Sequence, residues 1–197
     1  MAGQFAPARI EFHSMDWVDI FRQAQEVAIA AHGEQRYGAL PYEHHLRAVV
    51  EVLQRNGASL DDPATAPLLV AGWLHDVLED TPLMREDLKA QFGPEVAELV
   101  WRVTDEPGAS REDRKPATYR KTRENELAIV LKLADRIANV EEGIASRSNK
   151  LGMYRREQGE FAGILRDASQ HPMVLAMWKH LDQLLESGRR RGAPRED

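Results

Sequence analysis

The sequence predicts an all-α protein, a single-domain bundle of packed helices. Apolar residues recur at three- and four-residue steps over most of the chain, for example on the helical face of 17–32 that carries Val18, Phe21, Val27 and Ile29. No stretch of any length shows the alternation of apolar and polar residues that is typical of a half-exposed strand. Glycines and prolines separate the apolar stretches at spacings that suit helix ends.

Most helical segments have a start or stop signal of their own. Gly57 closes the second segment, Pro82 ends the third by restricting the residue before it, and Gly93 separates the fourth from the fifth. The sixth is apolar nearly all round its first half, as a central buried helix would be. The polar stretch 105–125 is expected to be the long flexible region. The expected helices are 17–32, 42–57, 66–80, 84–93, 94–104, 126–143, 154–168 and 172–187.

Composition places the chain among globular proteins of the cytoplasm. With 197 residues, 43% hydrophobic and 29% charged, it is long and apolar enough to bury one core. Without cysteine it forms neither disulfides nor thiolate metal sites, which fits a reducing compartment. The net charge of −6 argues against binding to nucleic acid, and we expect neither a membrane span nor a signal peptide. One domain is expected over 1–187, with its core at about 17–187, followed by a flexible tail over 188–197.

The segment GWLHDVLEDT (72–81) carries a dense group of ionisable side chains behind an apolar run. On one helix, a single broad face would hold His75, Asp76, Glu79 and Asp80. Three carboxylates that close repel one another unless a cation compensates them. The segment therefore indicates either a helix end that turns out to solvent or one wall of a metal site.

Two other helices offer further ligands. Asp135 lies in the apolar segment IVLKLADRIANV, where burying an unpaired carboxylate is costly. Lys132 and Asn139 extend a polar stripe through this helix, so a buried Lys132–Asp135 ion pair is the alternative interpretation. His44 and His45 stand at the start of a helix, and His44 is interpreted as an exposed first-turn residue.

Two nitrogen and two oxygen donors then make a mixed ligand set: His45, His75, Asp76 and Asp135. Such a set suits Mn²⁺, Fe²⁺ or Zn²⁺, with positions left open for water and a phosphate oxygen. A metal there would acidify a bound water and polarise a phosphoryl group. Glu79 and Asp80, close to the ligands, would handle protons and position the water.

The order of the motifs resembles that of the HD-domain phosphohydrolases. PYEHH, LHDVLEDT, FGPEVAELVWRVTD and LKLADRIANV follow one another, and the resemblance runs from about His32 to the C-terminal MWKHLDQLL. The sequence resembles in particular the hydrolase domain of the Rel/SpoT family and its stand-alone small alarmone hydrolases. These enzymes remove pyrophosphate from the 3′ position of (p)ppGpp.

The resemblance implies roles for individual residues. The four ligands named above would hold a divalent metal, usually Mn²⁺, with Fe²⁺ or Zn²⁺ as alternatives, while Glu79 and Asp80 would activate the attacking water. Asn139 would face the ribose and Arg36 the base or phosphate end. Tyr154 would stack on a purine or, alternatively, pack in the core. The residues implied in substrate binding are Arg36, Lys132, Asn139, Lys150 and Tyr154.

Some features depart from the family's pattern. Leu46 follows the first ligand in place of a proline, which leaves the ligand itself intact. Tyr37 stands where a lysine is common, and the segment from there to Pro41 is short. We expect these two differences to affect nucleotide recognition and not the metal. The basic stretch 111–125 is also unlike its counterpart, and a solvated loop is favoured over recruitment of phosphate by its cations.

The sequence thus predicts a metal-dependent phosphohydrolase, in particular a guanosine-3′,5′-bis(diphosphate) 3′-pyrophosphohydrolase (an alarmone hydrolase) that acts through a metal-activated water. One alternative keeps the chemistry but acts on a dNTP, a nucleoside monophosphate or (p)ppApp. Another is a catalytically silent module that binds a nucleotide or a partner, although a purely structural site needs neither Glu79 nor Asp80. The expected partner is a small nucleotide, without nucleic acid or membrane, and a homodimer is left open.

Overall fold

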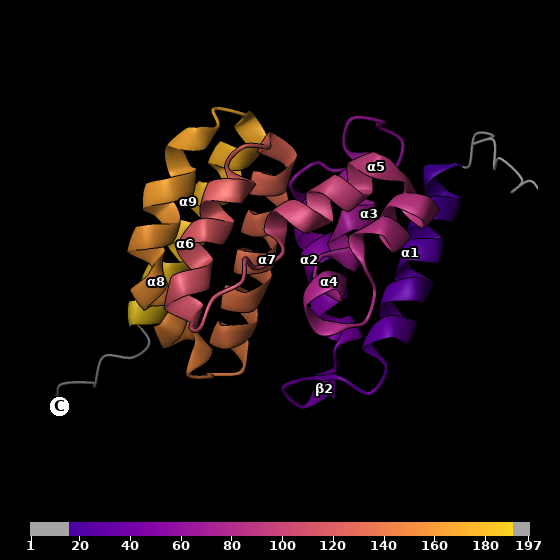
Figure 1. Cartoon of the computed structure of the whole chain (residues 1–197). Coiled ribbons are helices and arrows are strands. Elements are labelled where there is room, and N and C mark those ends of the chain that lie inside the picture. Colours follow the sequence, from indigo (N-terminus) through magenta and orange to yellow (C-terminus); the bar gives the residue numbers. More distant parts are fainter. Residues whose placement is uncertain (1–15, 191–197) are drawn as a thin grey trace, which may run out of the picture.

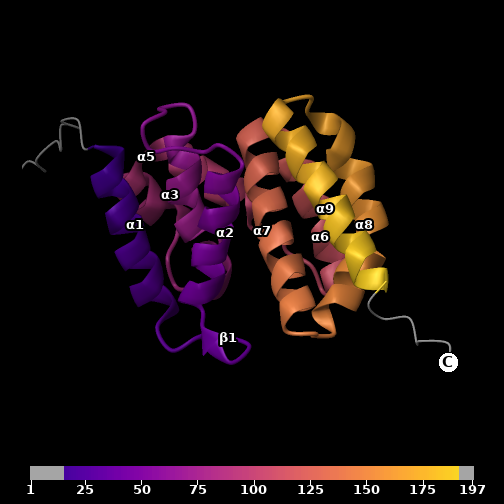
Figure 2. The same cartoon turned by 180° about the vertical axis from the view of Figure 1, so that it is seen from behind.

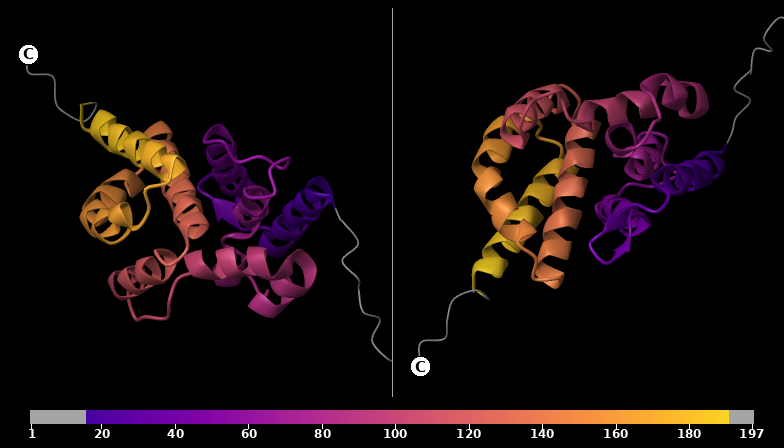
Figure 3. Two further views of the ribbon diagram at one scale, coloured as in Figure 1. Left: turned by 90° about the horizontal axis from the view of Figure 1, so that it is seen from above. Right: turned by 60° about the horizontal axis from the view of Figure 1, so that its bottom comes forward.

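Two groups of helices flank one long helix, α7 (Glu126–Ala145), in the computed structural model, which describes residues 16–190. The helices α1 to α5 lie on one side of α7, and α6, α8 and α9 lie on the other (Figure 1). The view from behind in Figure 2 and the two views in Figure 3 show the same division. The helical fold class predicted from the sequence is confirmed.

The remaining elements are short or medium-length helices and one small hairpin. In chain order they are α1 (Trp17–His32), β1 (Arg36–Tyr37), β2 (Leu40–Pro41), α2 (Glu43–Arg55), α3 (Ala66–Leu74), α4 (Val77–Asp80), α5 (Arg85–Val103), α6 (Arg111–Thr122), α8 (Lys150–Leu165), the 3-10 helix η1 (Arg166–Ala168) and α9 (Pro172–Arg190). The sequence did not predict the hairpin. Its two-residue strands are antiparallel, and they are too short to show an alternating pattern.

The long helix α7 is buried along most of its length because both helix groups pack against it. It packs against α2 and α5 on one side and against α8 and α9 on the other. Its apolar residues, such as Ile129, Leu131 and Ile137, have no exposed surface. At its start, the Asn125 side chain accepts a 3.0 Å hydrogen bond from the amide of Ala128 and so caps the helix. The predicted central helix is therefore confirmed.

Glycine and proline end helices where the sequence predicted it. Gly93 has a φ of +87°, a conformation that glycine adopts at little cost, and it divides α5 into two helical pieces. Thr81, the residue before Pro82, has extended backbone angles and ends α4. The segment 66–80 is not one continuous helix, however, because His75 and Asp76 form a turn between α3 and the single turn α4. The expectation that the four ionisable residues share one helical face is therefore wrong.

The expectation of a long flexible region over 105–125 is also wrong, since most of it forms α6. Ser110 and Asp113 make a reciprocal capping box at its start, with Ser110 Oγ accepting from the Asp113 amide at 3.1 Å. The buried face consists of Thr118, Tyr119 and Thr122, so it carries little apolar signal. Hydrogen bonds of the threonine hydroxyls to backbone carbonyls compensate for their burial.

The last two helices are longer than predicted. The helix α8 begins at Lys150, four residues before the expected start at 154, and α9 continues to Arg190. Residues 188–190 of the expected tail are thus helical, and 191–197 lie outside the described residues, as do 1–15. The division into a domain over 1–187 and a tail stays a prediction. Over residues 16–190, no helix is long and apolar enough to cross a membrane.

Candidate metal centre and active site

Three expected ligands meet where α2 packs against the junction of α3 and α4. His45 stands near the start of α2, and His75 and Asp76 form the junction. The Nε2 atoms of the two histidines lie 3.2 Å apart. Asp76 Oδ2 lies 3.5 Å from His45 Nε2 and 3.1 Å from His75 Nε2, so the three donor atoms converge.

These spacings fit a single divalent ion. Two ligand atoms that bind one ion at right angles, each at about 2.1 Å, lie about 3 Å apart. The separations of the three donors, 3.1 to 3.5 Å, are close to this value. Imidazole nitrogen together with carboxylate oxygen is donor chemistry suited to a borderline divalent metal. The geometry thus agrees with the expected divalent metal and leaves its identity open.

Neighbouring groups orient two of these donors. His75 Nδ1 lies 2.9 Å from the Gly72 carbonyl oxygen and donates to it, which leaves the lone pair of Nε2 directed at the site. Gly72 lets α3 approach α2 closely, because a Cβ there would lie 3.0 Å from Leu53 Cδ1. The Tyr42 hydroxyl donates a 2.6 Å hydrogen bond to Asp76 Oδ2.

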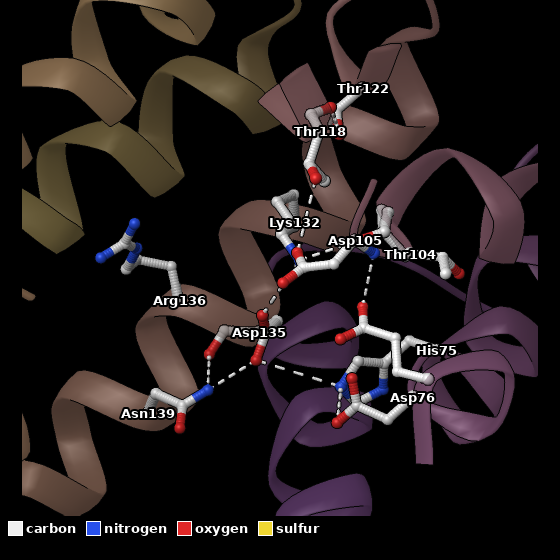
Figure 4. A network of polar contacts seen from close by, with 12 residues as sticks. His75, Asp76, Thr104, Asp105, Thr118, Thr122, Lys132, Asp135, Arg136 and Asn139 are labelled. Carbon is white, nitrogen blue, oxygen red and sulfur yellow. Dashed lines mark hydrogen bonds and ion pairs between the residues drawn. The ribbon is translucent and has the colours of Figure 1, made fainter. Parts of the chain in front are cut away.

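Asp135 approaches His75 from α7, as Figure 4 shows, and it lies close to His45 as well. Its Oδ1 lies 3.4 Å from His45 Nε2 and 3.9 Å from His75 Nε2. The Asn139 amide donates to the same oxygen at 2.5 Å. Lys132 Nζ lies 3.7 Å from Asp135 Oδ2, so the ion pair considered as the alternative interpretation is present beside the histidine contacts. The fourth expected ligand thus lies next to the two histidines, while the three donors that all converge are those of His45, His75 and Asp76.

The histidines and aspartates of the cluster shift one another's pKa values in opposite directions. Burial lowers the pKa of His45, but hydrogen bonds and charge from Asp135 and Asp76 outweigh it and raise the pKa to about 9. For Asp76, burial raises the pKa, but the charge of His75 and the hydrogen bond with His45 outweigh it and lower the pKa well below its usual value. The pKa of Asp135 is lowered in the same way. Without a metal, protons on the histidines would compensate the carboxylates.

Glu79 and Asp80 point in different directions. Glu79 lines the cavity beside Asp76, and its Oε1 accepts a 2.8 Å hydrogen bond from the Asp105 amide. Burial raises the pKa of Glu79, and the positive charge of Lys132 partly offsets this rise. Asp80 does not line this cavity, and its Oδ2 accepts from Gln35 Nε2 at 2.8 Å. The two carboxylates that the sequence paired therefore have separate surroundings.

A cavity of about 250 Å³ opens beside the cluster and is lined from both helix groups. Asp76, Glu79 and Asp135 contribute carboxylates to its wall. A larger number of basic side chains line it as well: Arg36, Arg111, Lys115, Lys132, Arg136 and Lys150. A cavity with a carboxylate–imidazole cluster at one wall and cations around it suits a phosphorylated ligand.

Two of these cations come from α6, which the sequence interpretation treated as a loop. Lys115 Nζ donates to Asp105 Oδ1 at 2.6 Å, and burial together with Lys132 lowers the pKa of Lys115. Arg111 makes two hydrogen bonds to Glu157, at 2.6 and 3.1 Å. The same carboxylate lies 3.3 Å from Arg136 of α7. The signal that could have found these residues is the capping box at 110–113, which starts a helix with both cations on it.

The expected substrate contacts all lie at this cavity, although several are engaged with protein groups. Asn139 accepts a 2.8 Å hydrogen bond from the Tyr37 hydroxyl, and Lys150 Nζ lies 4.2 Å from the centre of the Tyr37 ring. Tyr154 is buried, with the Arg136 guanidinium 4.7 Å from its ring centre, so it lines the cavity and packs in the core at once. His44 is exposed, as predicted.

The structure gives Tyr37 a contact that the sequence did not predict. Tyr37 was expected to affect nucleotide recognition and not the metal, which stays a prediction, but its ring stacks on that of His45, an expected ligand, with ring centres 4.8 Å apart and planes 18° apart. The two-residue strand β1 turns this side chain inward, and it is 8% exposed. The sequence gives no sign of this contact because it depends on how the hairpin folds back onto α2.

The helical fold and the paired histidine and aspartate donors define a class of metal-centred helical proteins, and the comparison with protein families agrees. The family model for the HD domain matches residues 24–160. The chain belongs to the HD-domain family. The recognition made from the sequence motifs is therefore confirmed.

Curated relatives are similar over most of this chain. The chain is 36% identical over 155 residues to guanosine-3′,5′-bis(diphosphate) 3′-pyrophosphohydrolase of Vibrio cholerae. This alignment covers 75% of this chain and 21% of the relative. Identity to the Drosophila melanogaster guanosine-3′,5′-bis(diphosphate) 3′-pyrophosphohydrolase MESH1 is 30%, over 70% of this chain and 77% of the relative. The chain thus spans about a fifth of the Vibrio protein but most of the Drosophila one.

The fold is shared with solved structures. A metazoan ortholog of SpoT that hydrolyzes ppGpp superposes with a TM-score of 0.66 at 25% identity, covering 88% of this chain and 96% of that one. A protein of Listeria monocytogenes superposes with a TM-score of 0.54, also at 25% identity, over 72% of this chain and 99% of that one. The overall helical fold is therefore shared with these two structures.

Proposed function

We propose that this protein is a metal-dependent phosphohydrolase that converts guanosine 3′,5′-bis(diphosphate) to GDP and pyrophosphate. The carrying observation is the convergence of His45, His75 and Asp76 at one wall of a cavity whose other walls are rich in cations. The similarity to pyrophosphohydrolases of this nucleotide, at 30 and 36% identity, supports the choice of substrate.

We propose His45, His75, Asp76 and Asp135 as the groups that hold the ion, with Mn²⁺ as its identity and Fe²⁺ or Zn²⁺ as alternatives. When bound, such an ion would lower the pKa of water and neutralise charge on a phosphoryl group. Gly72 and Tyr42 orient two of the donors, as their hydrogen bonds to His75 and Asp76 indicate.

Glu79 is the proposed acceptor of the proton from the attacking water. Its Oε1 is held by the Asp105 amide, which leaves Oε2 for the water. A raised pKa brings this carboxylate closer to the basicity that proton transfer near neutral pH requires. The water oxygen would bond to the phosphorus that is attached to the ribose 3′-oxygen. The bond between this phosphorus and the 3′-oxygen would break, and the 3′-oxygen would take a proton from solvent. Asp80, the other carboxylate expected to activate the water, accepts from Gln35 outside the cavity, so we assign it a smaller part than Glu79.

The basic side chains of the cavity would bind and orient the phosphates. Lys132 is almost fully buried beside Asp135, so it lies where charge on the reacting diphosphate would collect. Lys115 and Arg111 add two cations from α6 to the cavity wall. In the structure Lys115 bonds to Asp105 and Arg111 bonds to Glu157, and we propose that each also binds a phosphate oxygen of the substrate. Arg36, Asn139, Lys150 and Tyr154 are the proposed contacts to the nucleoside and its remaining phosphates.

Product analysis over a nucleotide panel tests this function. The purified protein with Mn²⁺ would be incubated with ppGpp, ppApp, a dNTP and a nucleoside monophosphate, and the products would be separated by anion-exchange chromatography. We expect pyrophosphate and GDP from ppGpp as the fastest reaction. Triphosphate from the dNTP, or inorganic phosphate from the monophosphate, at a higher rate would assign the protein to another nucleotide. No turnover on any member would contradict the enzymatic role.

A further inference from the structure

We propose that Tyr37 is a positioning residue of the metal centre, which holds the ring of His45 directly and the carboxylate of Asp135 through Asn139. The inference rests on the metal site of the proposed function and is independent of which nucleotide the protein cleaves. Tyr37 comes from the hairpin at the rim of the cavity, so it also joins that rim to the metal centre.

The two histidines of the cluster are held in different ways. His75 donates from Nδ1 to the Gly72 carbonyl, the usual means of fixing a metal-binding imidazole. His45 Nδ1 is buried and has no hydrogen-bond partner within residues 16–190. Another contact must therefore set the orientation of the His45 ring.

The Tyr37 ring supplies the stacked contact, and the Tyr42 ring lies edge-on to His45 with ring centres 5.6 Å apart. The centre of the Tyr37 ring lies 4.8 Å from that of the His45 ring, and the two planes are 18° apart, which is a stacked arrangement. Rotation of His45 about its side-chain bonds would carry the imidazole into the tyrosine ring. The stack thus restricts His45 to orientations in which Nε2 faces His75, 3.2 Å away.

The Tyr37 hydroxyl reaches a second ligand through one intermediate. It donates a 2.8 Å hydrogen bond to Asn139 Oδ1, and Asn139 Nδ2 donates to Asp135 Oδ1 at 2.5 Å. Because an ionised carboxylate only accepts, Asn139 must present its amino group to Asp135 and its oxygen to Tyr37. Asp135 therefore sets the orientation of the amide, and the Tyr37 hydroxyl holds the amide in place by donating to Asn139 Oδ1.

The outer contact of the Tyr37 ring connects this arrangement to the rim. Lys150 Nζ lies 4.2 Å from the ring centre, within the range of a cation–π interaction. With His45 and Lys150 both packed against it, the ring is committed to these contacts and serves as support for the ligands, not as a stacking platform for a base.

Metal affinity of Tyr37 variants tests the proposal without any nucleotide. Titration calorimetry with Mn²⁺ would compare the wild type with Tyr37→Phe, which keeps the stack but loses the hydroxyl, and Tyr37→Leu, which loses both. Removal of groups that support metal ligands typically weakens affinity by about 10- to 100-fold. We expect about this loss for Tyr37→Leu, a smaller loss for Tyr37→Phe, and altered visible absorption bands in both when Co²⁺ replaces Mn²⁺.

Tyr119→Phe is the matched control. Tyr119 is also buried at the cavity, but its hydroxyl accepts from Arg136 at 2.9 Å and bonds to none of the four expected ligands. Its variant should bind Mn²⁺ like the wild type. If Tyr37→Leu does not fold, Tyr37→Phe and the Co²⁺ spectrum decide alone. Wild-type affinity and spectra in the folded Tyr37 variants, or equal losses in Tyr119→Phe, would overturn the proposal, whether or not ppGpp proves to be the substrate.

Discussion

The backbone amide of Asp105 donates a 2.8 Å hydrogen bond to Glu79 Oε1, while the Asp105 side chain accepts from Lys115 Nζ at 2.6 Å. One residue of the loop after α5 thus positions the proposed proton acceptor with its main chain and a cavity cation with its side chain. Figure 4 shows Asp105 and Lys132 below Thr118 and Thr122 of α6. The site therefore depends on α6 as well as on the ligand helices.

Replacement of Glu79 by glutamine removes the proposed proton acceptor without changing its size. We expect Glu79→Gln to lower kcat for ppGpp by about 10²- to 10⁴-fold, the usual contribution of general acid–base catalysis. In the wild type, activity should fall as the pH drops through the raised pKa of Glu79, because the protonated acid cannot accept a proton. At Mn²⁺ concentrations that keep the site loaded, the variant should lack this acidic limb. Rate–pH profiles of both proteins check it, and unchanged kcat in the variant would exclude the role.

Asp80 should matter less than its neighbour. Asp80→Asn keeps an oxygen that accepts from Gln35 Nε2, and the side chain does not line the cavity. We expect kcat to fall by less than about tenfold, that is by less than about 1.4 kcal/mol in the activation free energy. Steady-state kinetics beside Glu79→Gln measure the difference. An equal loss in both variants would mean that Asp80 reaches the reacting atoms, as the sequence interpretation supposed.

Lys115 should contribute to nucleotide binding. Lys115→Gln removes a charged donor whose hydrogen bond to phosphate is worth about 1.5–3 kcal/mol, so KM for ppGpp should rise by about tenfold or more. Arg120→Gln is the control, because Arg120 is an exposed cation of the same helix and does not line the cavity. Its KM should stay at the wild-type value. Equal KM values for wild type and Lys115→Gln would remove α6 from the binding surface.

The metal-free protein should lose stability as the pH rises. The folded protein raises the pKa of His45 from 6.5 to about 9, so the proton on His45 stabilises the fold fully below pH 6.5 and ceases to do so as the pH passes 9. The shift corresponds to about 3 kcal/mol. Thermal unfolding in a chelator should show this decline, while stabilisation by added Mn²⁺ should grow over the same range because the metal needs neutral histidine. A chelated protein of constant stability from pH 6 to 9 would contradict the charge balance inferred for the cluster.

The sequence predicted several helices and their ends well because their signals are local. The apolar periodicity of 17–32 and 126–143 and the breaks at Gly93 and Pro82 each act within a few residues, and the structure has them. The His-Asp pair and the polar stripe of α7 could be assigned to one site because the order of motifs resembled a known family. Their meeting at one cavity required the tertiary packing of α7 against α2.

The rest of the site depends on contacts that leave little trace in the sequence. The buried face of α6 is made of Thr118, Tyr119 and Thr122, whose hydroxyls bond to backbone or arginine groups, so hydrophobic periodicity is weak there. Tyr37 reaches His45 only because a hairpin with two-residue strands brings its ring against α2. In both cases hydrogen bonds or a ring stack fix the packing of the element, which an apolar helix face does elsewhere in the fold.

The central claim is that one metal site, built from α2, the α3–α4 junction and α7, carries the hydrolysis of ppGpp. The most direct measurement is the rate of pyrophosphate release from ppGpp at increasing Mn²⁺ concentration, for the wild type, Asp76→Ala and Asp135→Asn. Asp182→Ala, which removes a surface ion pair with Arg166, serves as the control. We expect saturable activation by Mn²⁺ in the wild type and control, and loss of both metal binding and activity in the two site variants. Full activity of a site variant without bound metal would contradict the account.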